Sequence, residues 1–528
     1  MSSAPSLWWR LQLLQPTLPL LAGGGVGGGH PRSPPRHMSY SFAVVPPPVP
    51  AATSAFETHV RTLLRHVPHP TFLTCTSYSP YFDSAAAQQQ QAAAAEAHSA
   101  TQHALTFLDD LLPADVGLVL TITATRATCA ASHDARQRQT TTSLTGATRD
   151  GTTAVLADFL QRTARPSSPQ QQRRSCGLMV LRGDDGGHAW RCAAALGAEA
   201  GDDDTVTAAG PPPYAAFADG AELLKFLSAS LGHRGADVCL CIGGYPQGHV
   251  LDRQWGQAVW QPPRTPSARS LLPHQTHASL QLLGDLDAVY ADTEAQLRRA
   301  HGSHDAPRSR SAELCATTSK ATLARLAAVR RLWTTPSVYP AERHLACTVS
   351  TIACKVRPAP PAADQDVGAR VVVTQMIMSA AEFLDYVDVV RRALEAHPPA
   401  TPTHATPSHS LVVVPGLMAP LRAEQFVRVV LQLKVLPSPP LQAALLAYGD
   451  AIAGAAAACT DDDGVDAYER AKEAAELSFQ RTMEDATVAI VRDLRAHGYT
   501  HVNIAAWQYG CGDAIGRVVA ALAADESL

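Results

Sequence analysis

The residues best suited to chemistry follow a short apolar run near the middle of the chain. The run Val238-Cys-Leu-Cys-Ile242 predicts a strand buried on both faces, because a strand with one wet face would alternate polar and apolar residues. The pair Gly243-Gly244 permits close backbone approaches, and Pro246 stops the strand from continuing. Tyr245 and His249 would then be presented at the carboxyl end of a strand, which is where parallel α/β sheets place their sites.

Strands and helices that could hold this turn in place alternate along the chain. A buried strand followed by a helical pattern, repeated, predicts a parallel sheet with crossover helices. Eight such units match the requirement of a closed barrel, so the predicted fold class is α/β, a (β/α)8 or TIM barrel. The predicted strands are Tyr40–Val45, Val116–Thr123, Thr140–Thr145, Cys176–Leu181, Val238–Ile242, Arg370–Ile377, Leu411–Pro415 and Val502–Ala506.

Polar residues that end these strands would converge on one mouth of the barrel. They are Thr123 after the second strand, Asp184 after the fourth, Tyr245 and His249 after the fifth, and Gln375 at the sixth. Each has an ordinary structural explanation when taken alone, since Asp184 could close a satisfied turn and Gln375 could be a core amide. The set together defines the candidate site.

Three segments interrupt a single barrel that would span residues 39–528. The segment near 83–100 is rich in Ala and Gln, and the segment near 186–215 is rich in Gly, Asp and Pro. Both compositions are typical of exposed insertions. The largest, 250–342, contains helical patterns at Leu280–Ala300 and Leu323–Trp333. Structureless loops of that length are uncommon in compact domains, so we expect a helical insertion on the barrel rim. It would offer a surface for a homo-oligomer or a protein complex.

The N-terminal extension has a composition of its own. The first 56 residues contain no Asp or Glu, but they contain Arg10, Arg32 and Arg36 and the apolar segment Leu7–Leu14. These features are typical of a mitochondrial transit peptide, which predicts that residues 1–38 direct import and are removed. The alternative is a disordered extension on a cytoplasmic protein.

Composition excludes several classes of partner. Charged residues make up 17% of the chain and the net charge is −4, which gives no electrostatic reason to expect nucleic acid. We also predict no membrane span, because the apolar runs are broken by prolines and glycines before they reach about 20 residues. The 11 cysteines are scattered, which indicates reduced core residues and no metal site.

Several of these motifs resemble one family. The turn Tyr245-Pro-Gln-Gly-His249 is similar to the Tyr-Pro-Glu-x-His loop of the methylenetetrahydrofolate reductases, flavoproteins built on a (β/α)8 barrel, with Gln247 at the usual glutamate. Leu181-Arg-Gly-Asp184, Val373-Thr-Gln375 and Val414-Pro-Gly416 resemble its Leu-Arg-Gly-Asp, Ile-Thr-Gln and Val-Pro-Gly. The matches run in family order from residue 40 to the C-terminus.

The resemblance implies an FAD-dependent oxidoreductase. Such an enzyme takes hydride from NADH or NADPH and reduces 5,10-methylenetetrahydrofolate to 5-methyltetrahydrofolate, in one-carbon and methionine metabolism. By the same resemblance, Asp184 and Gln375 would be the catalytic residues, with Asp184 near the flavin and the folate and Gln375 contacting the folate. The implied FAD-binding residues are Thr123, Asp184, Gly244, Tyr245, His249 and Lys355.

The most consequential departure from the family lies in the first strand. The family reads Phe-Glu-Phe-Phe-Pro-Pro there, and its glutamate is the general acid, whereas this chain reads Phe42-Ala-Val-Val-Pro-Pro47. Ala43 cannot transfer a proton. The Asn-Arg pair after strand eight is also replaced, by Trp507-Gln508. Two functions follow: a reductase whose activity is weakened at Ala43, or a catalytically degenerate barrel, with or without its FAD, that serves as a structural or assembly subunit of a mitochondrial complex.

Overall fold

The computed structural model divides the chain into two compact units. The first comprises Met1–Gly248, Ala341–Ala419 and Val491–Leu528, and the second comprises His249–Pro340 and Pro420–Ile490. The structure describes residues 7–19, 37–46, 53–76, 102–123, 156–161, 174–181, 220–231, 238–247, 310–334, 369–396, 410–433, 435–460 and 462–526.

The first unit is a closed barrel of eight parallel strands. Each strand pairs with the next along the chain, and the last strand pairs with both its predecessor and the first, which closes the sheet. The strands are β2 (Ser39–Val44), β3 (Phe72–Thr76), β4 (Gly117–Thr123), β5 (Cys176–Leu181), β6 (Val238–Gly244), β7 (Val371–Met376), β8 (Ser410–Met418) and β9 (His501–Ala505). The predicted α/β barrel, with its first strand paired to its last, is confirmed.

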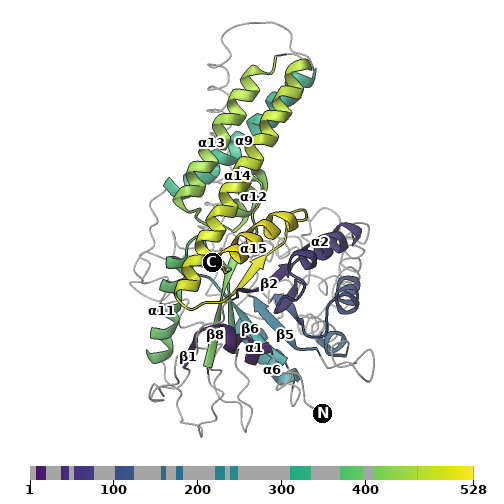
Figure 1. Ribbon diagram of the computed structural model, residues 1–528, viewed down its shortest axis with the longest axis vertical. Helices are drawn as coiled ribbons and strands as arrows, with labels where there is room; N and C mark the ends of the chain where they lie inside the picture. The colour runs from purple at the N-terminus through teal and green to yellow at the C-terminus, as the bar shows by residue number, and fades with distance from the viewer. Residues whose placement is uncertain are drawn as a thin grey trace, which may run out of the picture. The chain divides into compact units, whose positions relative to one another are not determined.

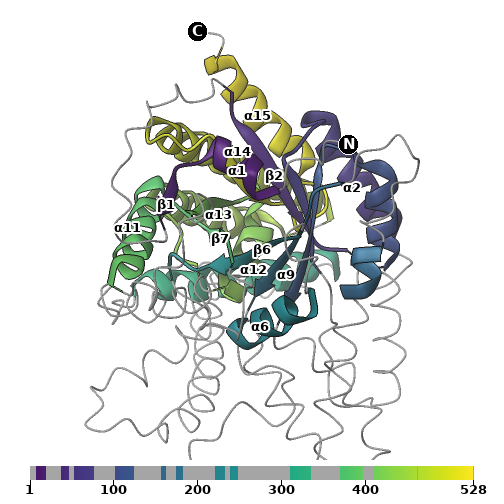
Figure 2. The same ribbon diagram turned by 90° about the horizontal axis from the view of Figure 1, so that it is seen from below.

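Helices cover the outside of this sheet. They include α2 (Thr53–His66), α6 (Gly220–Leu231), α11 (Ala380–Ala396) and α15 (Gly512–Glu526), which Figure 2 shows around the strands. The amphipathic helix α2 buries Phe56, Val60 and Leu63 against the barrel wall. It also packs closely on α15, where a Cβ added to Gly512 would lie 2.7 Å from Thr62 Cγ2.

The sequence prediction missed one strand of the barrel and counted another segment in its place. The prediction placed a strand at Thr140–Thr145, which lies outside the described residues. Strand β4 pairs directly with β5, with Leu118 opposite Cys176 and Thr123 opposite Leu181, so the sheet has no place for another strand between them. The eighth strand is instead β3, between β2 and β4. Thr123 therefore ends the third barrel strand and not the second.

The N-terminal segment closes the amino-terminal end of the barrel. Helix α1 (Leu7–Leu14) buries Leu7, Trp8 and Leu11 in one apolar cluster with inward-facing residues of β3 to β8. The Trp8 indole donates a hydrogen bond of 3.2 Å to the Ser410 carbonyl at the start of β8. Strand β1 (Thr17–Pro19) then pairs antiparallel with β8. Residues 7–19 are thus packed structure.

The second unit is helical. Its elements are α9 (Arg310–Thr334), α12 (Ala423–Leu433), α13 (Pro439–Ala458) and the greater part of α14 (Asp462–Ala496). In Figure 1, α9, α13 and α14 run side by side. Helix α9 lies within the predicted helical insertion 250–342. The segment Pro420–Ile490 joins it, although the sequence pattern had suggested that this segment continues the barrel.

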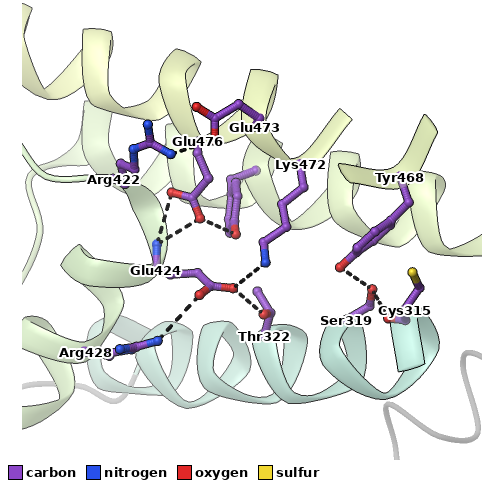
Figure 3. Close-up of polar contacts among 11 residues, drawn as sticks. Cys315, Ser319, Thr322, Arg422, Glu424, Arg428, Tyr468, Lys472, Glu473 and Glu476 are labelled. Atoms are coloured by element: carbon purple, nitrogen blue, oxygen red, sulfur yellow. Dashed lines mark hydrogen bonds and ion pairs between the residues drawn. The ribbon is translucent and has the colours of Figure 1, made fainter. Parts of the chain in front are cut away.

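A polar network links the helices of the second unit (Figure 3). Glu424 at the start of α12 accepts a hydrogen bond of 2.9 Å from Thr322 of α9 and lies 3.5 Å from the Lys472 ammonium group of α14. Glu476 of α14 is buried, and it accepts a hydrogen bond of 2.7 Å from the Tyr448 hydroxyl of α13. The backbone N–H of Glu424 also points to the Glu476 carboxylate, which therefore caps α12.

Helix α13 is long and apolar enough to cross a membrane, by length and composition only. Its 18-residue window has a mean hydropathy of 1.3, and 28% of that window is buried. A single helix of this kind is weak evidence, because core helices of soluble proteins meet the same criteria. Here the helix buries Leu441, Leu445, Tyr448 and Ile452 in its unit and carries Asp450 within the apolar stretch.

Candidate functional site

The carboxyl ends of the barrel strands form the candidate site. Inward-facing residues are identified by the central apolar cluster, which includes Val119, Met179, Cys241, Val373 and Val414. Side chains alternate along a strand, so the residues two positions later face the same interior, nearer the mouth. Leu181 follows Met179 in this way and packs against the cluster. Gln375 is half-buried near the end of β7.

A buried polar network on β2 and β9 fixes the inward positions of those strands. Ser41 donates a hydrogen bond of 2.9 Å to Asn503 Oδ1, and its oxygen lies 3.2 Å from His501 Nε2. Thr71 lies 3.3 Å from the other ring nitrogen, His501 Nδ1. Both ring nitrogens of His501 thus have a hydroxyl group within hydrogen-bonding distance. Burial and the positive charge of Arg10 lower the pKa of His501 to about 3, so the ring stays neutral.

Ala43 is the inward mouth residue of β2, two positions after Ser41. Its register partner across the β2–β9 pair is Ala505, and each residue is 8% exposed. The Ala506 N–H donates a hydrogen bond of 2.8 Å to the Ala43 carbonyl, which continues the pairing past the strand end. This part of the mouth therefore presents two methyl groups, and neither strand supplies a proton donor at that level.

A β-bulge sets the position of Gln375. The β7–β8 register shifts between Val373 and Met376, and the Gly416 N–H donates a hydrogen bond of 2.8 Å to Thr374 Oγ1. A Cβ at Gly416 would lie 2.0 Å from the Thr374 carbonyl oxygen, so only glycine fits this close approach. Bulges often re-aim a side chain beside a site. The Val414-Pro-Gly416 motif thus has a physical reason, which is to let β8 pass the bulge that carries Gln375.

The turn after β6 folds Tyr245 back over the strand end. A Cβ at Gly243 would lie 2.5 Å from Leu181 Cδ2 and 3.2 Å from the Tyr245 hydroxyl, so the phenol ring and Leu181 both lie over Gly243. A Cβ at Gly244 would instead lie 2.6 Å from the Tyr386 hydroxyl and 2.7 Å from Val372 Cγ1. Gly244 is therefore required for packing of the sheet against α11.

The same turn is held by the start of α11. Gln247 donates a hydrogen bond of 3.1 Å from Nε2 to Glu382 Oε2, and this oxygen also accepts the Met378 N–H at 3.2 Å. The Glu382 N–H donates to Ser379 Oγ at 3.2 Å, in the manner of a capping box. Gln247, the residue that departs from the glutamate of the resembled loop, thus has a structural partner that a second carboxylate would repel.

The structure brings only part of the predicted set together. Ala43, Gly244, Tyr245 and Gln375 lie at the carboxyl ends of their strands, and Thr123 is the last residue of β4, in register with Leu181. Asp184, His249 and Lys355 lie outside the described residues.

Sequence reasoning missed Thr76, and it named Trp507 only as a departure from the resembled family. Thr76 ends β3, and a five-residue run of apolar and β-branched residues, Phe72–Thr76, was the available signal for that strand. Trp507 follows β9, and its indole nitrogen is buried with no hydrogen-bond partner in the part of the chain that the structure describes.

The described residues fit an acceptor-bearing aromatic ligand in two respects. The Trp507 N–H is a buried donor with no partner among the described residues, and buried donors are seldom left unpaired. Tyr245 and Leu181 provide an apolar wall. On the side of Gly244 where a Cβ would lie, the space is filled by Tyr386 and Val372. Among the described residues, no group of three or more His, Cys, Asp or Glu could hold a metal ion.

A separate cleft of about 380 Å³ opens between α2 and the start of α15. It is lined by Ser54, Ala55, Thr58, His59, Thr62, Tyr509, Gly510, Gly512 and Asp513. His59 Nε2 lies 2.9 Å from the Ala506 carbonyl, and burial lowers the pKa of His59. None of the predicted site residues lies in this cleft.

The geometry defines the first unit as a (β/α)8 barrel with polar and aromatic side chains at its mouth. No protein-family model matches the sequence, and no curated protein matches it. Among solved structures, a similar chain is described as an uncharacterized protein from Clostridium thermocellum that binds two copies of 5-methyl-5,6,7,8-tetrahydrofolic acid. Its TM-score is 0.35 at 8% identity, with 92% of this chain and 94% of that chain covered.

Proposed function

We propose that the barrel mouth binds a reduced folate and that the protein is a methylenetetrahydrofolate reductase-like barrel whose proton delivery is weakened. The observation that carries this proposal is the position of Ala43, which faces the mouth beside Ala505 where the resembled family has its general acid. A placed general acid contributes roughly 10²–10⁴ in rate.

Other residues of the mouth support a folate as the ligand. The Gln375 amide can donate and accept at once, which suits a pterin edge that has both donors and acceptors. Its place beside a β-bulge fixes where the amide is presented. Tyr245 and Leu181 would flank a flat ring, and Trp507 would donate to an acceptor of the ligand.

The cofactor part of the proposal follows from the resemblance. FAD, when bound, would supply the hydride, with NADH or NADPH as its source. The residues proposed to hold it are Thr123, Asp184, Tyr245, His249 and Lys355, of which Tyr245 lies at the mouth of the described barrel. A mitochondrial location is proposed on the composition of the N-terminal segment alone.

Folate binding is tested by titrating the full-length protein with 5-methyltetrahydrofolate in a calorimeter. We expect saturable binding that Gln375→Leu weakens about tenfold, the effect of one lost hydrogen bond to a bound ligand. Gln442→Leu, in the helical unit, is the matched control and should bind like the wild type. Absence of binding in the wild type would refute the proposal, and an unchanged affinity in Gln375→Leu would refute the role of Gln375.

A second function is favoured by the helical unit. The same barrel without turnover would serve as a structural or assembly subunit, with α9, α12, α13 and α14 as the added surface. The exposed side of α13 carries Leu446, which is 44% exposed. Purified protein with no flavin absorbance and no folate binding would favour this function over the first.

A further inference from the structure

Two cysteines meet in the helical unit, apart from the barrel mouth. Cys315 lies in the second turn of α9, and Cys459 is the C-cap residue of α13. Both are buried in one small cluster with Ala456 and Tyr468. Figure 3 shows Cys315 on α9 with Ser319 and Tyr468 close by, where Ser319 donates a hydrogen bond of 2.9 Å to the Tyr468 hydroxyl.

Both thiols lie at helix ends, where the structure opens most easily. Helix α9 begins at Arg310, and the backbone of Cys459 has already left the helix, with φ −83° and ψ 92°. Helix ends fray at a lower free energy than helix interiors, so a small-molecule oxidant can reach these sulfurs without global unfolding. The remaining polar contacts of the network would meanwhile keep α9 beside its neighbours.

We propose that Cys315 and Cys459 form a redox-sensitive pair, which a low-molecular-weight disulfide converts into an intramolecular bond between α9 and the end of α13. In the first step, one cysteine loses its proton to solvent, and its thiolate attacks the oxidant disulfide, releasing one reduced thiol. In the second step, the other cysteine loses its proton and attacks the mixed disulfide, releasing a second reduced thiol. The protein loses two electrons and two protons, and the oxidant is reduced by two electrons.

The environment of the pair makes this reaction slow and pH-dependent. Burial, the neighbouring Cys459 thiol and Glu469 raise the pKa of Cys315 to about 11, and the positive charge of Lys472 partly opposes them. Little thiolate exists at neutral pH. As long as the pH is below that pKa, the thiolate fraction rises about tenfold for each unit by which the pH is raised. Oxidation in glutathione buffer should therefore be faster at pH 8.5 than at pH 7.

A second cysteine pair in the same chain provides the control. Cys239 and Cys241 lie inside the barrel with their sulfurs 3.8 Å apart. They are two residues apart on one strand, which places their Cα and Cβ atoms about 6.7 Å apart, whereas a disulfide needs Cβ atoms about 3.8 Å apart. The strand would have to deform, so this pair should stay reduced although its sulfurs are close.

The test uses the full-length protein in buffers of reduced and oxidised glutathione, followed by alkylation and non-reducing peptide mass spectrometry. We expect a linked peptide that joins Cys315 to Cys459, together with an intact mass lower by two hydrogen atoms. The link should be absent in Cys315→Ser and Cys459→Ser and unchanged in Cys239→Ser. The oxidised wild type should also melt at a higher temperature than the reduced protein, and Cys315→Ser should show no such difference.

Two outcomes would overturn the proposal. One is a wild-type protein that stays fully reduced, or carries only mixed glutathione adducts, in buffers where exposed protein thiols oxidise. The other is a linked peptide that joins Cys315 or Cys459 to a different cysteine. Because the wild-type map decides both outcomes, the result does not depend on whether the serine variants fold.

Discussion

Replacement of Leu11 by alanine tests whether the N-terminal helix is a structural plug of the barrel. Leu11 is 0% exposed and packs with Leu7 and Trp8 on the inward-facing residues of the strands. A buried leucine replaced by alanine destabilises a protein by about 2–5 kcal/mol, through the lost transfer free energy and the cavity left behind. We therefore expect Leu11→Ala to lower the free energy of unfolding of the barrel by about 3 kcal/mol, roughly a 150-fold change in the equilibrium constant.

The same helix supplies the control. Leu13 lies two residues away and is 57% exposed, so Leu13→Ala should change stability by no more than about 0.5 kcal/mol. Urea unfolding followed by circular dichroism, with the transitions of the two units fitted separately, measures both variants. Equal effects of the two substitutions, or no effect of Leu11→Ala, would show that α1 does not close the barrel.

Four further results are expected. In a steady-state assay with NADPH and added FAD, Ala43→Glu should raise folate turnover by about 10²–10⁴, while the rate of flavin reduction changes little. Wild-type turnover equal to that of the variant would show that another residue acts as the acid. Gly416→Ala should abolish soluble expression or strongly lower the melting temperature, because the new Cβ would lie 2.0 Å from the Thr374 carbonyl oxygen. The control is Gly454→Ala, whose new Cβ would have nothing within 4 Å, and it should be neutral or stabilising by up to about 1 kcal/mol. The His501 ring is neutral in the folded barrel, but in the unfolded chain it protonates below its ordinary pKa of 6.5. The free energy of unfolding should therefore fall by about 1.4 kcal/mol per pH unit as the pH falls from 6.5 towards 3. In urea titrations at several pH values, His501→Gln should remove this dependence. Tyr448→Phe should lower the stability of the helical unit by about 1–3 kcal/mol, since Glu476 is buried and loses its hydroxyl donor, and a thermal melt as stable as the wild type would contradict the network.

Removal of the N-terminus bears on location as well as stability. The composition of residues 1–38 predicts mitochondrial import, and the mass of the endogenous N-terminus tests it. Cleavage near residue 36 would remove α1 and β1 from the barrel and expose the apolar cluster that they cover. A mature chain that retains Leu7–Leu14 would support the role of α1 in closing the amino-terminal end of the barrel. A mature chain that lacks these residues would need another segment to bury the apolar cluster at that end.

The sequence by itself determined the barrel and the order of most of its strands. Long apolar runs such as Val238–Ile242 and Val371–Val373 can be buried on both faces only in a parallel sheet with crossover helices, so local pattern fixed their place. The short strand Phe72–Thr76 was missed because five residues carry little periodicity, and its identity depends on pairing with β2 and β4, which are distant in sequence.

Only the tertiary structure decided what each apolar face packs against. The periodicity of α12, α13 and α14 is the same whether these helices cover a barrel or pack on α9. The eight residues of α1 resemble a targeting segment in sequence, and only the structure shows that they are buried among the strands. At the candidate site, the sequence named Tyr245 and Gln375, because each lies at the end of a recognisable strand, and the family resemblance named Ala43. It could not reveal the bulge beside Gln375, the Gln247–Glu382 hydrogen bond or the buried cluster that Cys315 and Cys459 share. Each of these joins residues that the chain separates and that only the folded packing brings together.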